Sequence, residues 1–148
     1  MRAALALACL LAVGCSAGRK PYPDDLAPRN VSVRPSLAGV KATVSVHGVD
    51  AQCKTEYLGT LDLDQPSVAL GIPAGRPSWL VFNFSSSSWL RGSHSISAAT
   101  LLRPQPGYRY EIDASYKNDI YNVVLRELAP KGAARELPLR GFSACPAN

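Results

Sequence analysis

The sequence contains no long hydrophobic run and comparatively few charged residues. Its 148 residues include no apolar stretch near the roughly 20 residues that a membrane-spanning helix needs, which argues against a transmembrane helix in the mature protein. Only 18% of the residues are charged and 47% are hydrophobic, a balance opposite to that of disordered chains. A chain of this length is expected to form one domain with a core of its own.

Motifs for redox, metal and nucleotide chemistry are also missing. The sequence has no Cys-x-x-Cys and no glycine-rich phosphate loop, and neither His47 nor His94 has a second metal ligand at helical or zinc-ribbon spacing. We therefore expect no metal and no cofactor. The net charge is +5, but the basic residues are scattered in groups of at most two, which argues against nucleic-acid binding.

Two short patterns come near to catalytic motifs, and neither completes one. Residues 141–145, Gly-Phe-Ser-Ala-Cys, are followed by only three residues, so no helix can complete a nucleophile elbow around Ser143. Glu111 and Asp113 lie two residues apart and would share one strand face with Arg109. A solvated strand face explains this spacing better than an acid–base pair. We expect no enzyme activity.

The N-terminal residues have the pattern of an export signal. A positive start at Arg2 precedes residues 3–13, which are all apolar or small. Such a run is too short to span a bilayer but matches the apolar region of a secretory signal. A buried helix of the domain would show polar side chains on one face, and this run has none.

The signal ends in Leu-Ala-Val-Gly-Cys at residues 11–15. This ending resembles the lipobox of bacterial lipoprotein precursors, although Ala12 stands where leucine is commonest in that family. The resemblance implies removal of residues 1–14 and a diacylglycerol on Cys15, which would hold the protein on a lipid bilayer without a transmembrane helix. Ordinary signal-peptidase cleavage near residues 16–17 is the alternative, with Cys15 removed or left free.

In the same family, the residue after the lipidated cysteine influences sorting between the two membranes of a Gram-negative cell. Ser16 resembles the outer-membrane type, whereas Asp at this place favours the inner membrane. The resemblance therefore implies a lipid-anchored protein of the cell envelope, at the outer membrane and facing the periplasm. Residues 15–30 contain three prolines and no apolar periodicity, and we interpret them as a flexible tether after the acylated cysteine.

Two of the four cysteines remain after these N-terminal assignments. Cys9 lies in the removed signal, and Cys15 is assigned to lipid. Cys53 and Cys145 are left, and export to an oxidising compartment favours a disulfide between them. The alternative is a pair of buried free thiols.

Residues 31–148 are expected to form one all-β domain, an antiparallel β-sandwich or small barrel. Apolar residues alternate with polar ones, as in half-buried strands, and the 12 prolines and 11 glycines suit short connecting turns. Asn118 and Asp119 tolerate positive φ, so they predict a tight hairpin turn. Strands are expected near residues 31–34, 42–47, 57–63, 68–72, 79–84, 96–102, 108–116 and 120–128.

Three short motifs resemble small bacterial β-sandwich modules of the PEGA or transthyretin-like kind. They are Leu58-Gly59, the Ile-Pro-Ala-Gly of residues 72–75, and the Pro-Gly-Tyr of residues 106–108. The motifs are short and cover a small part of the chain. The resemblance implies a fold class and no particular function.

Residues 85–95 form the most unusual stretch, a serine-rich segment that carries Trp89, Leu90 and Arg91. We interpret it as a flexible loop. Aromatic side chains on the loops of a β scaffold commonly contact sugars or proteins, so these three residues are candidate contacts for an envelope protein or a cell-wall glycan. The alternative is that Trp89 folds back over the edge of the sandwich.

These observations favour a membrane-anchored envelope lipoprotein whose β domain has a binding or structural role without catalysis. A second hypothesis is an inhibitor or immunity protein that blocks a lytic enzyme of the envelope, because such proteins are often short, exported and disulfide-bonded. Neither hypothesis identifies a ligand.

Overall fold

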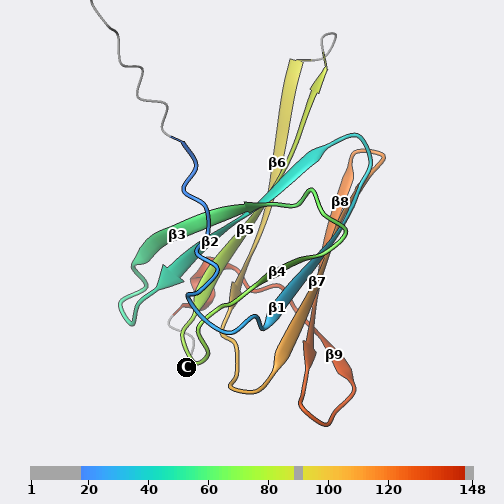
Figure 1. Ribbon diagram of the computed structural model, residues 1–148. Coiled ribbons are helices and arrows are strands. Elements are labelled where there is room, and N and C mark those ends of the chain that lie inside the picture. Colours follow the sequence, from blue (N-terminus) through green and yellow to red (C-terminus); the bar gives the residue numbers. More distant parts are fainter. Residues whose placement is uncertain (1–17, 89–91, 146–148) are drawn as a thin grey trace, which may run out of the picture.

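The computed structural model describes residues 18–88 and 92–145, which form two packed β-sheets (Figure 1). In these ranges no helix has the length and apolar character needed to cross a membrane. A single 3-10 turn, η1 (Phe142–Ala144), follows the last strand. The strands are β1 (Val31–Leu37), β2 (Lys41–Val49), β3 (Thr55–Asp62), β4 (Val68–Leu70), β5 (Ser78–Ser88), β6 (Gly92–Leu102), β7 (Arg109–Lys117), β8 (Ile120–Leu128) and β9 (Ala134–Leu137).

One sheet has five strands in the order β4-β1-β7-β8-β9, and the other has four in the order β3-β2-β5-β6. The predicted all-β sandwich is confirmed. One pairing is parallel rather than antiparallel, because β1 runs beside β7 with Val31 opposite Tyr110 and Leu37 opposite Tyr116. Alternation in a sequence indicates which residues face the core, but it does not indicate the direction of a distant partner strand.

The core lies between the sheets and consists of the inward-facing residues of successive strands. The pattern is clearest in β7, where Tyr110, Ile112, Ala114 and Tyr116 are buried and the residues between them are more exposed. Burying a large apolar side chain stabilises a fold by about 1.5–3 kcal/mol. The four-stranded sheet contributes, among others, the buried side chains of Val44, Val46, Leu80, Phe82 and Phe84.

The segment before β1 is packed against the domain from Lys20 onward, which corrects the part of the predicted flexible tether, residues 15–30, that the structure describes there. Thr60 N donates a hydrogen bond to Lys20 O (2.9 Å), and Tyr22 N donates to Thr60 O (3.2 Å), so this segment extends the edge of β3. Tyr22 is 6% exposed, and its hydroxyl donates to Gly71 O at 2.7 Å. Prolines are compatible with such an edge position, and the packed chain therefore begins at Lys20.

The predicted hairpin between β7 and β8 is confirmed. Asn118 and Asp119 have φ angles of 52° and 60°, in the left-handed region that a tight hairpin turn requires. Lys117 and Ile120 flank the turn as the last pair of the ladder. Short polar side chains tolerate this backbone conformation, which is why the turn could be predicted locally.

The stretch 85–95 is largely strand, which corrects the prediction of a flexible loop. β5 and β6 stay paired from Ser85 opposite Ser95 out to Ser88 opposite Gly92, and this hairpin projects beyond the rest of its sheet (Figure 1). A run of serines has no apolar alternation, so the sequence contained no pattern for these strand ends. The three candidate contact residues, Trp89, Leu90 and Arg91, lie outside the described residues.

The C-terminal segment connects the two sheets on the side opposite the N-terminal segment. β9, which the sequence did not predict, pairs with β8 at the edge of the five-stranded sheet. Leu101 N then donates to Arg140 O (2.8 Å), so the chain crosses to β6 at the edge of the other sheet. Phe142 contacts Trp79 with ring centroids 5.3 Å apart. The two terminal segments thus each bridge the edges of both sheets.

Candidate functional site: a groove beside the disulfide

The predicted disulfide between Cys53 and Cys145 is confirmed. The two Cα atoms are 5.9 Å apart, and the cysteines are 92 residues apart in sequence. Cys53 lies in the turn between β2 and β3, and Cys145 directly follows η1. The bond therefore ties the C-terminal segment to one end of the four-stranded sheet.

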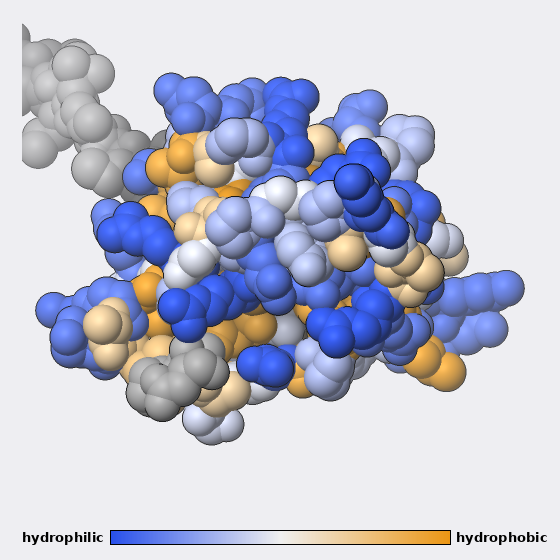
Figure 2. All heavy atoms as spheres, turned by 90° about the horizontal axis from the view of Figure 1, so that it is seen from below, coloured by the Kyte–Doolittle hydropathy of each residue, from blue (hydrophilic) through white to orange (hydrophobic). Residues whose placement is uncertain are grey.

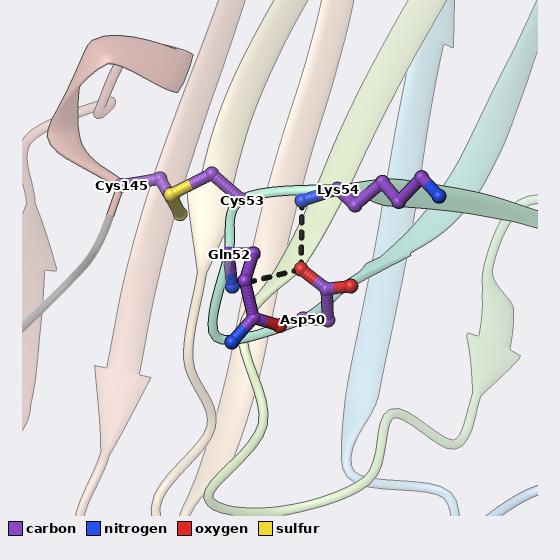
Figure 3. The surroundings of a disulfide bond; sticks show 5 residues. All are labelled: Asp50, Gln52, Cys53, Lys54 and Cys145. Carbon is purple, nitrogen blue, oxygen red and sulfur yellow. Dashed lines mark hydrogen bonds between the residues drawn. A yellow bond between two sulfur atoms is a disulfide. The ribbon is translucent and has the colours of Figure 1, made fainter.

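The turn that carries Cys53 is held in shape by Asp50 (Figure 3). The Asp50 carboxylate accepts hydrogen bonds from Gln52 N (2.9 Å) and Lys54 N (2.8 Å), and Asp50 N donates to Lys54 O (3.0 Å). This arrangement keeps Cys53 at a φ of 61°, a conformation that side-chain-bearing residues rarely adopt. Asp50 thus positions the cysteine for its partner.

A groove of about 1120 Å³ lies at this end of the sandwich and is bordered by Cys145. Its walls come from five parts of the chain: the N-terminal segment, the β2–β3 hairpin, the loop after β4, the residue after β6, and the C-terminal segment. The volume is of the order of a small-molecule or peptide site. The residues that matter for its chemistry are Leu26, Asp50, Lys54, Glu56, Arg76 and Arg103.

Charges of both signs surround the groove. Arg103 Nε donates to Gly75 O at 3.0 Å, which fixes this guanidinium beside the loop after β4. Within the described part of the chain, the side chains of Lys54, Glu56 and Arg76 have no ion pair or hydrogen bond, and all three are exposed. These side chains are therefore free to pair with charges on a ligand.

Apolar side chains also line the groove. Leu26, contributed by the packed N-terminal segment, is 40% exposed in the groove wall. Seen from below in Figure 2, the molecule shows mainly hydrophilic side chains with smaller apolar patches among them. The groove therefore suits a ligand that carries both apolar and charged groups, such as a polypeptide segment.

The sequence did not predict this groove, because its residues come from separate turns. Lys54, Arg76 and Arg103 are isolated basic residues in the sequence, and only the fold brings them to one end of the sandwich. The prolines and glycines around Arg76 predicted a turn and gave no indication of a site. Of the predicted site residues, Cys145 borders the groove and Cys53 is bonded to it, whereas Cys15 lies outside the described residues.

The acidic pair on β7 is engaged in ion pairs on the outer face of the five-stranded sheet. Arg34 contacts Glu111 and Asp113, each at 2.9 Å, and Arg126 also bonds to Asp113. Hydrogen bonds from Arg126 and Arg34 hold the pKa of Asp113 below its ordinary value. Both carboxylates are therefore paired with arginines. Across the described ranges, no group of three His, Cys, Asp or Glu side chains is arranged to hold a metal ion.

No protein-family model matches the chain, and no curated protein matches it. Among solved structures, the chain is similar to sea bream transthyretin in complex with thyroxine, with a TM-score of 0.43 and 10% sequence identity. The similarity covers 76% of this chain and 99% of the transthyretin chain. The sandwich architecture itself follows from the strand pairing described above and does not depend on this likeness.

Proposed function

We propose that this protein is a lipid-anchored component of the bacterial cell envelope whose β-sandwich binds a ligand without catalysis. The observation that carries the proposal is the disulfide between Cys53 and Cys145. It joins the two cysteines that remain when Cys9 is assigned to the signal and Cys15 to lipid. Such a bond persists in an oxidising, exported compartment.

The packed N-terminal segment places the domain close to its anchor. If Cys15 is acylated, only residues 15–19 precede Lys20, the first residue whose backbone is hydrogen-bonded to the domain. Fully extended, five residues reach about 17 Å. The domain would therefore lie next to the bilayer surface instead of being held far above it.

The groove lies away from this attachment point. Arg19 pairs with Asp62, at the end of β3, whereas the groove is bordered by Thr55 and Glu56 at its beginning. Seven residues of strand separate these ends, which corresponds to roughly 20 Å. In this arrangement we expect the end of the groove at Thr55 and Glu56 to stay accessible to a ligand in the periplasm.

Binding without catalysis agrees with the state of the candidate catalytic groups. The carboxylates of Glu111 and Asp113 are already paired with arginines, and Ser143 lies exposed in the short η1 turn. The groove instead offers unpaired Lys54, Glu56 and Arg76 side chains beside apolar surface. These features favour recognition of a partner over acid–base or nucleophilic chemistry.

Metabolic labelling with palmitate tests the anchor. The wild-type protein is expected to incorporate label, and Cys15→Ala is expected to lose it. Cys9→Ala is the matched control, because a cysteine in the removed signal should not affect labelling of the mature chain. Equal label in the wild type and Cys15→Ala would refute lipid attachment at this residue.

Membrane fractionation tests the location. The wild-type protein is expected in the outer-membrane fraction, and Ser16→Asp is expected to shift it toward the inner membrane. Unchanged distribution of Ser16→Asp would remove the support that Ser16 gives to outer-membrane sorting.

Crosslinking in intact cells tests the groove. A photoreactive residue in place of Arg76 is expected to capture a ligand, and the same residue in place of Lys117, in the distant β7–β8 hairpin, is the control. Capture of a stoichiometric lytic enzyme would support the inhibitor alternative. Identical products at both positions would show that the groove is not a specific site.

A further inference from the structure

The two solvent-facing sheet surfaces of this sandwich differ in chemistry. On the five-stranded sheet, Arg34, Glu111, Asp113 and Arg126 form a connected set of ion pairs. Such a surface is typical of the solvated face of an amphipathic sheet. The outer surface of the four-stranded sheet has a different composition and is not explained in the same way.

We name the outer surface of the four-stranded sheet the neutral face. Its residues alternate with core residues such as Val44, Val46 and Phe82, and register pairing brings them onto one side of β3, β2, β5 and β6. Charged residues on this side, Lys41 and Asp62, stand at one end. Between that end and the disulfide, the neutral face consists of Thr43, Ser45, His47, Tyr57, Thr60, Trp79, Val81, Asn83, Ser97, Ala99 and Leu101, the last of which is 5% exposed.

Aromatic side chains form a row across the neutral face. His47 is paired in register with Tyr57 on one side and with Trp79 on the other. The His47 and Tyr57 ring centroids are 5.3 Å apart, and Phe142 continues the row beside Trp79, also at 5.3 Å. The His47 and Tyr57 rings are tilted by 51°, and Phe142 of η1 meets Trp79 edge-on at 77°. Because neighbouring strands lie about 4.8 Å apart, register places His47 of β2 between Tyr57 of β3 and Trp79 of β5.

Hydroxyl and amide groups lie beside the aromatic row. Thr60 Oγ1 is 2.8 Å from Ser45 Oγ and 2.7 Å from the Tyr57 hydroxyl, and Ser97 Oγ donates to Asn83 Oδ1 at 2.5 Å. Each hydroxyl has one donor and two acceptor sites, so these groups retain capacity for further hydrogen bonds. Partial burial lowers the pKa of His47, which favours its uncharged form at neutral pH.

We propose that the neutral face is a binding site for an uncharged polysaccharide. Sugar rings stack on the aromatic row, and sugar hydroxyls bond to the hydroxyl and amide groups beside it. The proposal rests on the proposed envelope location only for access to such a polymer. It names a ligand surface that is separate from the groove.

The composition of the neutral face favours this ligand over other macromolecules. A polyanion would require clustered cations, and the interior of the face has none. The core of a protein interface commonly has aromatic anchors and arginine, whereas the aliphatic residues here are Val81, Ala99 and Leu101, and Leu101 is 5% exposed. Individual aromatic rings beside uncharged donors and acceptors match the alternating apolar and hydroxyl surfaces of a sugar ring.

Sedimentation with insoluble polysaccharide tests the proposal. Detergent-solubilised full-length protein is incubated with chitin or cellulose, which are uncharged polymers, and the bound fraction is measured after centrifugation. For soluble chitin oligosaccharides, the emission of Trp79 is followed in the Trp89→Phe variant, which leaves one tryptophan. The wild-type protein is expected to be retained by at least one polymer, and Trp79 emission is expected to change on titration.

Three tyrosine variants separate stacking from general destabilisation. Tyr57→Ala is expected to weaken binding about tenfold, a change typical of an important aromatic contact. Tyr57→Phe keeps the ring and is expected to retain most of the affinity. Tyr121→Ala is the matched control, because Tyr121 is 40% exposed compared with 39% for Tyr57 but lies on the other sheet. Thermal unfolding of each variant reports whether the fold is retained.

The outcomes separate this proposal from that of the lipid anchor. No retention of the wild type by either polymer, or equal weakening by Tyr57→Ala and Tyr121→Ala, would overturn it. Crosslinking of the face to a protein in cells, without retention by polysaccharide, would also overturn it. Loss of palmitate labelling in Cys15→Ala is measured independently, so failure of either proposal leaves the other interpretable.

Discussion

Asn30 and Ile72 exchange two hydrogen bonds across 42 residues of sequence. Asn30 Nδ2 donates to Ile72 O and Ile72 N donates to Asn30 Oδ1, both at 2.8 Å. The asparagine amide therefore acts in place of a strand residue and pairs with the backbone just after β4. This pair anchors the N-terminal segment where it enters β1.

Asn30→Ala is expected to lower the free energy of unfolding by about 2 kcal/mol, because two partly buried hydrogen bonds are lost. Asn30→Asp should destabilise at least as strongly, since a carboxylate cannot donate to Ile72 O. Urea unfolding measures both effects. Asn122→Ala, at an exposed position on β8, is the control and should change stability by less than about 0.5 kcal/mol.

Gly71 is expected to tolerate no side chain. A Cβ at this position would lie 1.9 Å from Ala27 O, a backbone atom of the packed N-terminal segment. Gly71→Ala should therefore lower stability by at least about 2 kcal/mol and loosen that segment, so that trypsin cleaves faster after Arg29. Gly141→Ala, whose Cβ would meet Ser143 Oγ at 3.6 Å, should have little effect. Unchanged proteolysis of Gly71→Ala would contradict the close packing.

Reduction of the Cys53–Cys145 disulfide is expected to destabilise the domain strongly. The cysteines are 92 residues apart, and a closed loop of this size corresponds to about 4–5 kcal/mol in the chain-entropy model. Unfolding midpoints with and without a thiol reductant measure the effect. The double variant Cys53→Ala/Cys145→Ala should match the reduced protein and should no longer respond to reductant.

Asp113 is expected to contribute to acid sensitivity. Its pKa is lowered in the folded state by Arg126 and Arg34, so the folded protein favours the ionised carboxylate. The resulting stabilisation is present above the ordinary pKa of about 3.9 and is lost as pH falls through the lower folded value. Asp113→Asn should flatten the loss of stability below about pH 4. Asp64→Asn, at an exposed site, should leave the acid limb unchanged.

Tyr22 and Tyr110 are expected to ionise only at high pH. Burial raises the pKa of each phenol to about 12. The folded state thus favours the neutral phenol, and this stabilisation is full below the ordinary pKa of about 10 and is lost as pH rises through about 12. The pKa of Tyr116 is also raised by burial, so phenolate absorbance of Tyr22→Phe should show one tyrosine fewer ionising at high pH than the wild type. Ionisation of Tyr22 near the ordinary pKa of about 10 would contradict the packing of the N-terminal segment.

Much of the strand pattern could be predicted because burial on one face leaves a local trace. Inward residues of β7, from Tyr110 to Tyr116, alternate with polar residues, so the strand and its buried face could both be predicted. Glu127 shows the limit of this reasoning. It occupies an inward position of β8 and is 7% exposed, but its carboxylate accepts from the Tyr110 hydroxyl (3.0 Å) and from Arg135 (2.8 Å). A buried glutamate interrupts the apolar alternation of the strand, so the sequence pattern does not indicate that Glu127 is buried.

The candidate groove and the neutral face could not be predicted, because neither is local in sequence. In the sequence, Trp79 and His47 are ordinary strand residues, and only the strand register shows that they are neighbours. Lys54 and Arg76 likewise meet only where two turns converge. The contact between Phe142 and Trp79 depends on a C-terminal segment that crosses from one sheet to the other.

The sequence by itself determined the fold class, the hairpin turn at Asn118 and Asp119, and the pairing of the last two cysteines. Those properties depend on alternation, on backbone preferences of single residues, and on counting. Tertiary structure alone decided that β1 runs parallel to β7 and that the proline-rich segment packs from Lys20 onward. The parallel pairing depends on a partner strand that is distant in sequence. The packing of the terminal segment depends on the open edge at β3, where backbone groups remain for it to pair with.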